Sequence, residues 1–142
     1  MFERLSEQLA VVATIDPDAY GTTTLTTDVF DMSVHHEAMF VILVGENAGT
    51  VDFDVQESTA TGSGTVTATA VASITQLTAG DDDVQVIVTV RGEDMTEGYR
   101  YLRGVLTLSA ATDAGVVALA DRARYKAASV GDLASVDEIV NA

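Results

Sequence analysis

The chain has no cysteine, no tryptophan and only one proline. The missing cysteines exclude disulfides, thiolate metal sites and a cysteine nucleophile. Basic residues are also scarce, with 7 Lys and Arg against 22 Asp and Glu, for a formal net charge of -15. A nucleic acid would be repelled by this charge, so binding through phosphate neutralisation is disfavoured.

No long apolar run is present, and no stretch approaches the length that a membrane helix needs. The first residues, Met1–Glu7, include two acids where a signal peptide would be basic. These features predict a protein that is used without classical secretion and without a membrane. At 142 residues and 47% hydrophobic composition, the chain is long enough for one domain with its own core.

Alternation of apolar and polar residues is the strongest pattern present. In Val51–Glu57 the apolar residues occupy every second position, and Val84–Arg91 repeats valine in the same way. In Tyr99–Ser109 three leucines share one parity. Because successive side chains of a strand point to opposite faces, these segments predict strands with one buried and one wet face.

Further strands are predicted between turn-forming residues. We expect them at Leu9–Ile15, Thr22–Met32, Met39–Val44, Val66–Ile74 and Val116–Leu119, with turns at Asp16–Asp18, Gly80–Asp83 and Glu93–Gly98. Met39–Val44 is apolar on both parities, which is typical of a strand covered on both faces.

The pattern predicts an all-β fold, an antiparallel β-sandwich of about eight strands, jelly-roll-like or immunoglobulin-like. Short connections and the lack of a long amphipathic helix favour it. We expect a sandwich domain over residues 11–125 between extended arms at 1–10 and 126–142. The first arm could form a short helix, or become ordered only on a partner.

Few residues suggest chemistry. His35 and His36 are adjacent and point in different directions on a strand, which disfavours a shared metal. Asp81–Asp83 lacks the spaced oxygens of a calcium loop and predicts a solvated turn. Asp52 and Asp54 share a wet strand face, which does not suit a general acid. With no nucleophile elbow and no phosphate loop either, we expect no enzyme, cofactor or metal site.

The charge and the aromatic residues suggest protein contacts instead. Fourteen of the acids but only one base, Arg4, precede Arg91, which is consistent with solubility or with a docking side near the arginines. The row Tyr99, Tyr101 and Arg103 is typical of a contact surface, or of a second core face. The candidate interface residues are Phe2, Arg4, Leu5, Tyr99, Tyr101, Arg103, Arg122, Arg124, Tyr125, Leu133, Val136 and Ile139.

Several blocks of the sequence resemble a group of small proteins encoded near the major capsid gene of tailed bacteriophages. These blocks are Glu7–Ala19, Val29–Ser33, Met39–Gly45, Val51–Ser58, Ala72–Leu77, Val88–Met95, Gly98–Arg103 and Ala128–Val140. None of them is a catalytic signature, although together they extend over most of the chain.

The resemblance implies a capsid decoration, or cement, protein on the outer capsid surface of the virion, assembled in the host cytoplasm. Its partners would be the major capsid protein and itself, as a homotrimer on the shell, and it would stabilise the mature head. Two alternatives stay open. One is another virion β-domain, in a tail, head-completion or fibre-associated role. The other is a carbohydrate-binding module, which the lack of tryptophan disfavours.

Overall fold

The computed structural model describes residues 4–60, 69–121, 137–138 and 140. Two short 3₁₀ turns and one helical turn accompany nine strands in this part of the chain. In chain order the elements are α1 Leu5–Gln8, β1 Ala10–Tyr20, β2 Thr23–Thr26, β3 Phe30–Asp31, η1 Met32–Val34, β4 Glu37–Asn47, β5 Val51–Ser58, β6 Thr69–Ser73, β7 Val84–Arg91, η2 Gly92–Asp94, β8 Tyr101–Leu108 and β9 Thr112–Ala120.

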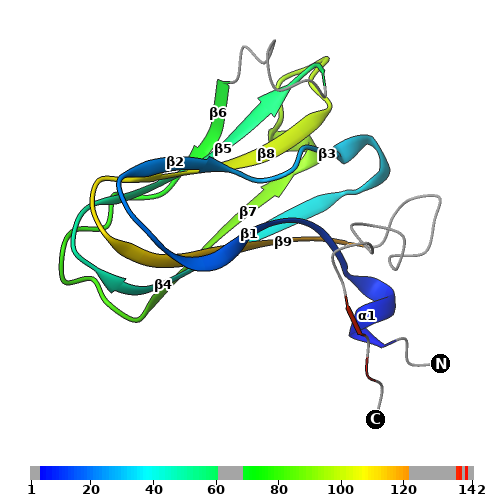
Figure 1. The fold of residues 1–142 in the computed structure, drawn as a ribbon. Coiled ribbons are helices and arrows are strands. Elements are labelled where there is room, and N and C mark those ends of the chain that lie inside the picture. The colour runs from blue at the N-terminus through cyan, green and yellow to red at the C-terminus, as the bar shows by residue number, and fades with distance from the viewer. Residues whose placement is uncertain (1–3, 61–68, 122–136, 139, 141–142) are drawn as a thin grey trace.

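The strands form two packed antiparallel sheets, so the predicted all-β sandwich is confirmed (Figure 1). One sheet has the order β1-β9-β4-β7 and the other β2-β8-β5-β6, with β3 also paired to β8. The pairs β1 with β9, β2 with β8, β4 with β7 and β5 with β6 are nested around one another. This nested pairing across two sheets is a jelly roll rather than an immunoglobulin topology.

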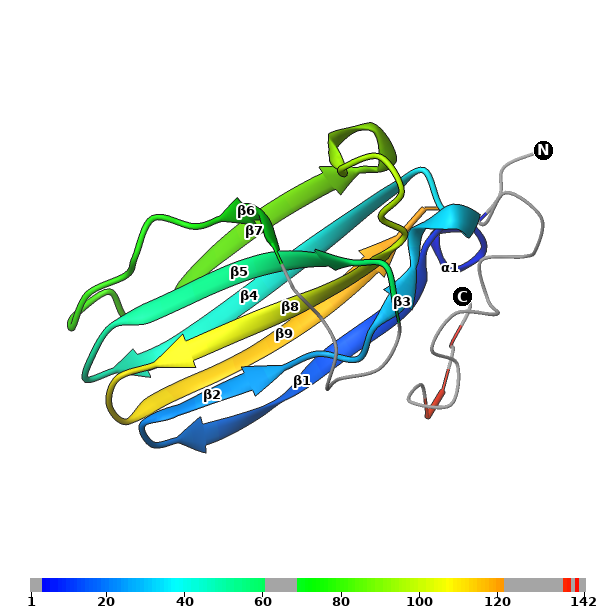
Figure 2. The ribbon, with the colours of Figure 1, turned by 90° about the horizontal axis from the view of Figure 1, so that it is seen from above.

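The core lies between the sheets, where the strands of one layer pass over those of the other (Figure 2). Phe40 of β4 reaches from one sheet to Phe30 and Phe53 of the other, with ring centroids 5.8 and 5.6 Å apart. Gly104 of β8 makes room for this cluster, because a Cβ there would lie 2.5 Å from Cζ of Phe53. Aromatic packing therefore joins the two layers at their centre.

The predicted turn at Asp16–Asp18 is wrong, because β1 continues through it to Tyr20. Pro17 is tolerated because β1 is an edge strand, paired only with β9, and the pairing shifts register between Ile15 and Asp18. Edge strands and bulges are where a strand accepts proline, which has no N–H to donate.

Other strands of the structure also begin or end at residues different from those predicted. Thr22–Met32 is divided into β2 and β3, with Met32 in η1. The last strand is longer than predicted, because β9 begins at Thr112 rather than Val116. Val84–Arg91 agrees with β7, whereas part of the predicted strand Val66–Ile74 lies outside the described residues.

Glu57, the last residue of a segment predicted to be half-buried, takes the inward parity of β5 and is 2% exposed. Its carboxylate Oε2 accepts a hydrogen bond of 2.8 Å from the backbone N–H of Thr96. The buried carboxylate therefore ties the loop before β8 to the end of the sandwich. In the described part of the chain, no helix is long and apolar enough to cross a membrane.

Candidate functional site

The outward side of the β1-β9-β4-β7 sheet is aliphatic, and we call it the apolar face. Directly paired residues of antiparallel strands lie on the same side of a sheet, so the register defines its rows. The residues of this face, by row, are Val11, Leu119, Met39 and Thr89; then Thr14, Val117, Val41 and Ile87; then Leu43 and Gln85 beside Gly115.

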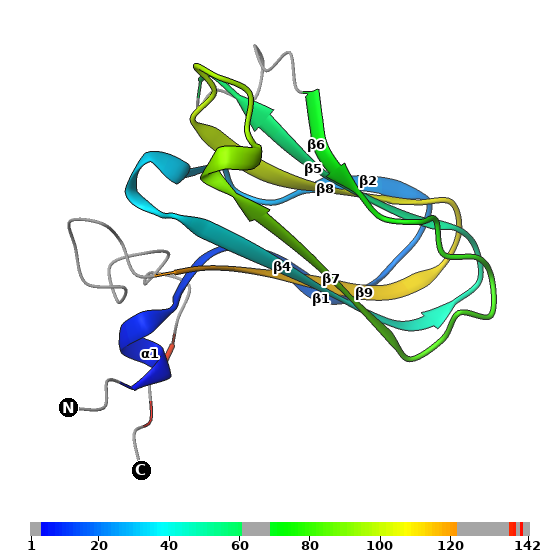
Figure 3. The same ribbon diagram turned by 180° about the vertical axis from the view of Figure 1, so that it is seen from behind.

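Two large side chains of this face are open to solvent. Ile87 is 61% exposed and Leu43 is 45% exposed, while Met39 and Val41 are half-buried among their neighbours. The prediction that Met39–Val44 is covered on both faces is therefore wrong for the described residues. Phe40 and Ile42 pack inward, but Met39, Val41 and Leu43 face outward, where no described strand or helix buries them fully. Figure 3 shows β7 at one edge of this sheet.

The outward side of the other sheet, here called the polar face, has a different character. Its side chains hydrogen-bond to one another across the strands. Gln76 donates to Asp52 at 2.7 Å, and Arg103 donates from Nε and from a terminal nitrogen to Oε1 of Gln56, at 3.0 and 2.9 Å. A face whose polar groups already bond to one another has less to offer a partner.

The predicted row Tyr99, Tyr101 and Arg103 lies at this polar face. Tyr101 and Arg103 point outward from β8, opposite Leu102 and Gly104, so the parity prediction is confirmed for these residues. Tyr99 precedes the strand, and its N–H bonds to the carbonyl of Thr96. Only two of the three side chains therefore share a strand face. Their role as an interface stays a prediction.

Asp31 and Arg100 form an ion pair at the edge of the polar face. Nε of Arg100 donates to Oδ1 of Asp31 at 2.8 Å, and a second bond joins its terminal nitrogen to Oδ2. The guanidinium also lies 5.4 Å from the ring centroid of Tyr101. The hydrogen bond from Arg100, ahead of bonds from Ser33, lowers the pKa of Asp31 from 3.8 to about 2.

Asp31→Asn should lower the unfolding temperature by about 2–4 °C at pH 7. Because the folded-state pKa of Asp31 lies below its unfolded value, the carboxylate stabilises the fold above about pH 4. That contribution is lost as the pH falls through about 2. Thermal denaturation should show a clear difference between variant and wild type at pH 7 and a much smaller one at pH 2, where about half of the Asp31 carboxyl is protonated. Asp28→Asn, which removes an exposed charge outside this pair, serves as control. An equal decrease in the unfolding temperature of Asp31→Asn at both pH values would contradict the ion-pair explanation.

Charge is distributed unevenly along the strand axis. The loops β1–β2, β4–β5, β6–β7 and β8–β9 meet at one end of the sandwich (Figures 1 and 2). These loops and the adjoining strand ends contain acids and no Lys or Arg; the acids are Asp16, Asp18, Glu46, Asp52, Asp81, Asp82, Asp83 and Asp113. The described arginines lie elsewhere, at Arg4, Arg91, Arg100 and Arg103.

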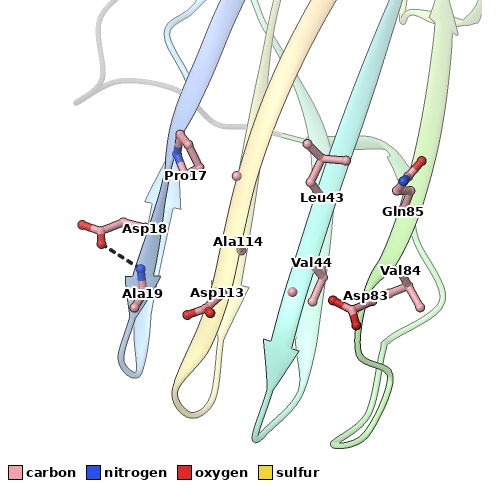
Figure 4. Close-up of a pocket in the computed structure, with 12 residues that line it drawn as sticks. Pro17, Asp18, Ala19, Leu43, Val44, Asp83, Val84, Gln85, Asp113 and Ala114 are labelled. Atoms are coloured by element: carbon pink, nitrogen blue, oxygen red, sulfur yellow. Dashed lines mark hydrogen bonds between the residues drawn. The ribbon is translucent and has the colours of Figure 1, made fainter.

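An open hollow of about 600 Å³ lies where the apolar face meets this acidic end (Figure 4). It exists because Gly45 and Gly115 carry no side chain there, with Leu43 and Pro17 beside them. A Cβ on Gly115 would lie 3.1 Å from Pro17, so the strands approach closely at this point. Asp18, Asp83 and Asp113 border the hollow from three different strands or their ends.

The two histidines have different environments. His35 is buried, and its Nδ1 lies 2.8 Å from the carbonyl oxygen of Asp121. His36 is exposed, and its backbone N–H donates to Oδ1 of Asp121. The pair therefore anchors the start of β4 against the end of β9.

The acidic tripeptide Asp81–Asp83 is largely occupied with its own turn. Oδ2 of Asp81 accepts bonds from the backbone N–H and the hydroxyl of Thr78, and the backbone bond comes first in lowering the pKa of Asp81. Oδ1 of Asp82 accepts a bond from the N–H of Asn47. Among the described residues, no three His, Asp or Glu side chains are grouped to hold a metal ion.

The remaining interface candidates lie at the chain ends. Arg4 and Leu5 are exposed at the start of α1, and Leu5 is 72% exposed. The other predicted interface residues lie outside the described residues; these are Phe2, Arg122, Arg124, Tyr125, Leu133, Val136 and Ile139. Sequence reasoning did not identify the apolar face, although Ile87 was a signal for it, because it shares its strand face with polar Gln85 and Thr89.

No protein-family model matches this sequence, and no curated protein matches it. Among solved structures, a chain of infectious bursal disease virus Gt strain is 14% identical over 84% of this chain and 33% of its own length, with a TM-score of 0.51. A chain of the disulfide-linked pili of Bacillus endospore appendages is 19% identical over 85% of this chain and 94% of its own, with a TM-score of 0.48. At 14% identity, the similarity to the viral chain shows a shared fold and nothing more.

Proposed function

We propose that this chain is a virion structural protein, a decoration protein that binds the outer surface of the major capsid shell and stabilises the mature head. The observation that carries the proposal is the apolar face. A chain with a net charge of -15 has little need of an exposed aliphatic surface for its own fold. The largest apolar patch of a monomer is often functional, and exposed Leu43 and Ile87 among half-buried aliphatic side chains suit contact with another protein.

The kind of partner comes from the resemblance to phage head proteins, and the fold is compatible with it. Jelly rolls occur in viral capsid domains and in lectins. The apolar face carries Val, Met, Leu and Ile but no aromatic ring among its described rows. Binding of sugar rings would call for stacked aromatic side chains, so this face favours a protein partner over a glycan.

Sedimentation with empty shells of the same virus tests the proposal. We expect the protein to bind expanded shells in high copy number and to leave unexpanded procapsids undecorated, because a decoration site forms when the shell expands. Saturation at hundreds of copies would separate decoration from a head-completion role, in which about one ring of copies binds. Absence of binding to either shell would exclude the proposed function.

A further inference from the structure

The apolar face has the extent of an interaction site. Two rows across four strands and a third across three strands, with Thr14, Thr89 and Gln85 included, cover roughly 350 Å², from strand spacings of about 4.8 Å and a rise of about 3.3 Å per residue. This lies within the range of about 300–600 Å² that the largest apolar patch of a typical monomer covers, and such patches are often functional. It is smaller than the roughly 800 Å² per partner of a standard interface, so one copy would bind weakly.

The two ends of the apolar face differ in charge. At one end Asp83 and Asp113 lie beside Gly45 and the hollow, with no described basic residue near them. At the other end Arg91 lies between Glu37 and Glu93, with nitrogen to oxygen distances of 3.7 and 3.4 Å. The border of the face is therefore negative at one end, and at the other end its basic residue Arg91 is already paired with acids.

This charge pattern disfavours a second copy as the occupant. Two stacked copies would each bring a net charge of -15 to the contact. Arg91, a described cation at the border of the face, already pairs with carboxylates of its own chain. A partner with aliphatic side chains and its own lysine or arginine would satisfy both the apolar rows and the acidic end.

We infer that the apolar face is the docking surface of this protein. Its partner is a protein surface that presents aliphatic side chains with lysine or arginine beside them. The aliphatic groups would pack on Leu43, Val41 and Ile87, and a long basic side chain would enter the hollow beside Asp113. The inference rests on the proposed function, which makes the shell of the major capsid protein this partner. It places the contact on the sheet opposite to Tyr101 and Arg103.

Shell binding by face variants tests this inference. Leu43→Glu and Ile87→Glu each place a charge on the apolar face at an exposed position, so the fold should persist. We expect each to weaken binding to expanded shells at least tenfold. The matched control is Thr24→Glu, an exposed position on β2, the edge strand of the other sheet, which should bind as the wild type does. Circular dichroism and thermal unfolding verify that each variant is folded.

Salt tests the charge part of the inference. Wild-type binding should weaken several-fold between about 50 and 300 mM salt. The double variant Asp83→Asn and Asp113→Asn should bind more weakly at low salt and depend less on salt. An unchanged salt dependence in the double variant would overturn the assignment of a basic partner.

The outcomes separate the inference from the proposed function. If folded Leu43→Glu and Ile87→Glu bind shells as the wild type does, the inference fails and the proposed function survives. If the wild type binds neither kind of shell, both fail. Sedimentation equilibrium of the protein by itself tests whether a second copy of the chain occupies the apolar face. A wild-type oligomer that Ile87→Glu converts to monomers would assign the face to a second copy and overturn the inference.

Discussion

Phe40→Ala should lower the free energy of unfolding by about 4 kcal/mol, the largest effect that we expect from a single substitution. Phe40 is fully buried at the centre of the sandwich and packs against Phe30 and Phe53 of the opposite sheet. Its truncation would remove the ring that joins the two layers and leave a cavity between them. A loss of this size approaches the whole stability of a marginal domain, about 5–15 kcal/mol.

Urea denaturation followed by circular dichroism measures the effect. Phe40→Leu is the matched control, because leucine keeps most of the apolar volume and should cost about 1–2 kcal/mol. An exposed truncation on the same strand, Leu43→Ala, should change stability by less than about 0.5 kcal/mol. A deficit below about 2 kcal/mol for Phe40→Ala would show that the sheets close over the missing ring.

The side chains that face the core could be predicted from the sequence for two strands. The alternation in Val84–Arg91 and Val51–Glu57 identified which side chains face inward, because strand parity is a local property. Strand order could not be predicted, since the pairing of β1 with β9 joins residues about a hundred positions apart. Local strand propensity also did not predict the full length of β9. Asp113 and Gly115 are poor strand formers that are held in the ladder by β1 and β4.

The apolar face shows a second limit of sequence reasoning. A strand with apolar residues on both parities reads the same whether its second face is covered by its own chain or kept for a partner. Met39, Val41 and Leu43 therefore predicted a covered strand, and the fold was needed to show that no described element packs on them. Conversely, Tyr101 and Arg103 were visible in sequence, but the bond from Arg103 to Gln56 was not.

The acidic end of the apolar face depends on one buried amide. Asn47, at the end of β4, is 4% exposed. Its Nδ2 donates to the carbonyl of Thr78 at 2.9 Å, and its Oδ1 accepts bonds from the N–H of Gly49 and the hydroxyl of Thr112. One side chain thus connects the β4–β5 turn, the loop before β7 and the start of β9.

Asn47→Leu should therefore lower the free energy of unfolding by about 3 kcal/mol, measured by urea denaturation. Leucine has the same branching but forms none of the three hydrogen bonds, each worth about 1 kcal/mol. The Thr78 carbonyl keeps a bond from the N–H of Asp81 and the Thr112 hydroxyl keeps its bond to the carbonyl of Ala110, so the N–H of Gly49 loses most. Thr112→Val is the control, because it removes one of these bonds and should cost about 1 kcal/mol. An equal cost for the two variants would mean that water replaces the amide. Since the loop that Asn47 holds contains Asp82 and Asp83, the folded variant should also show a weaker salt dependence of shell binding.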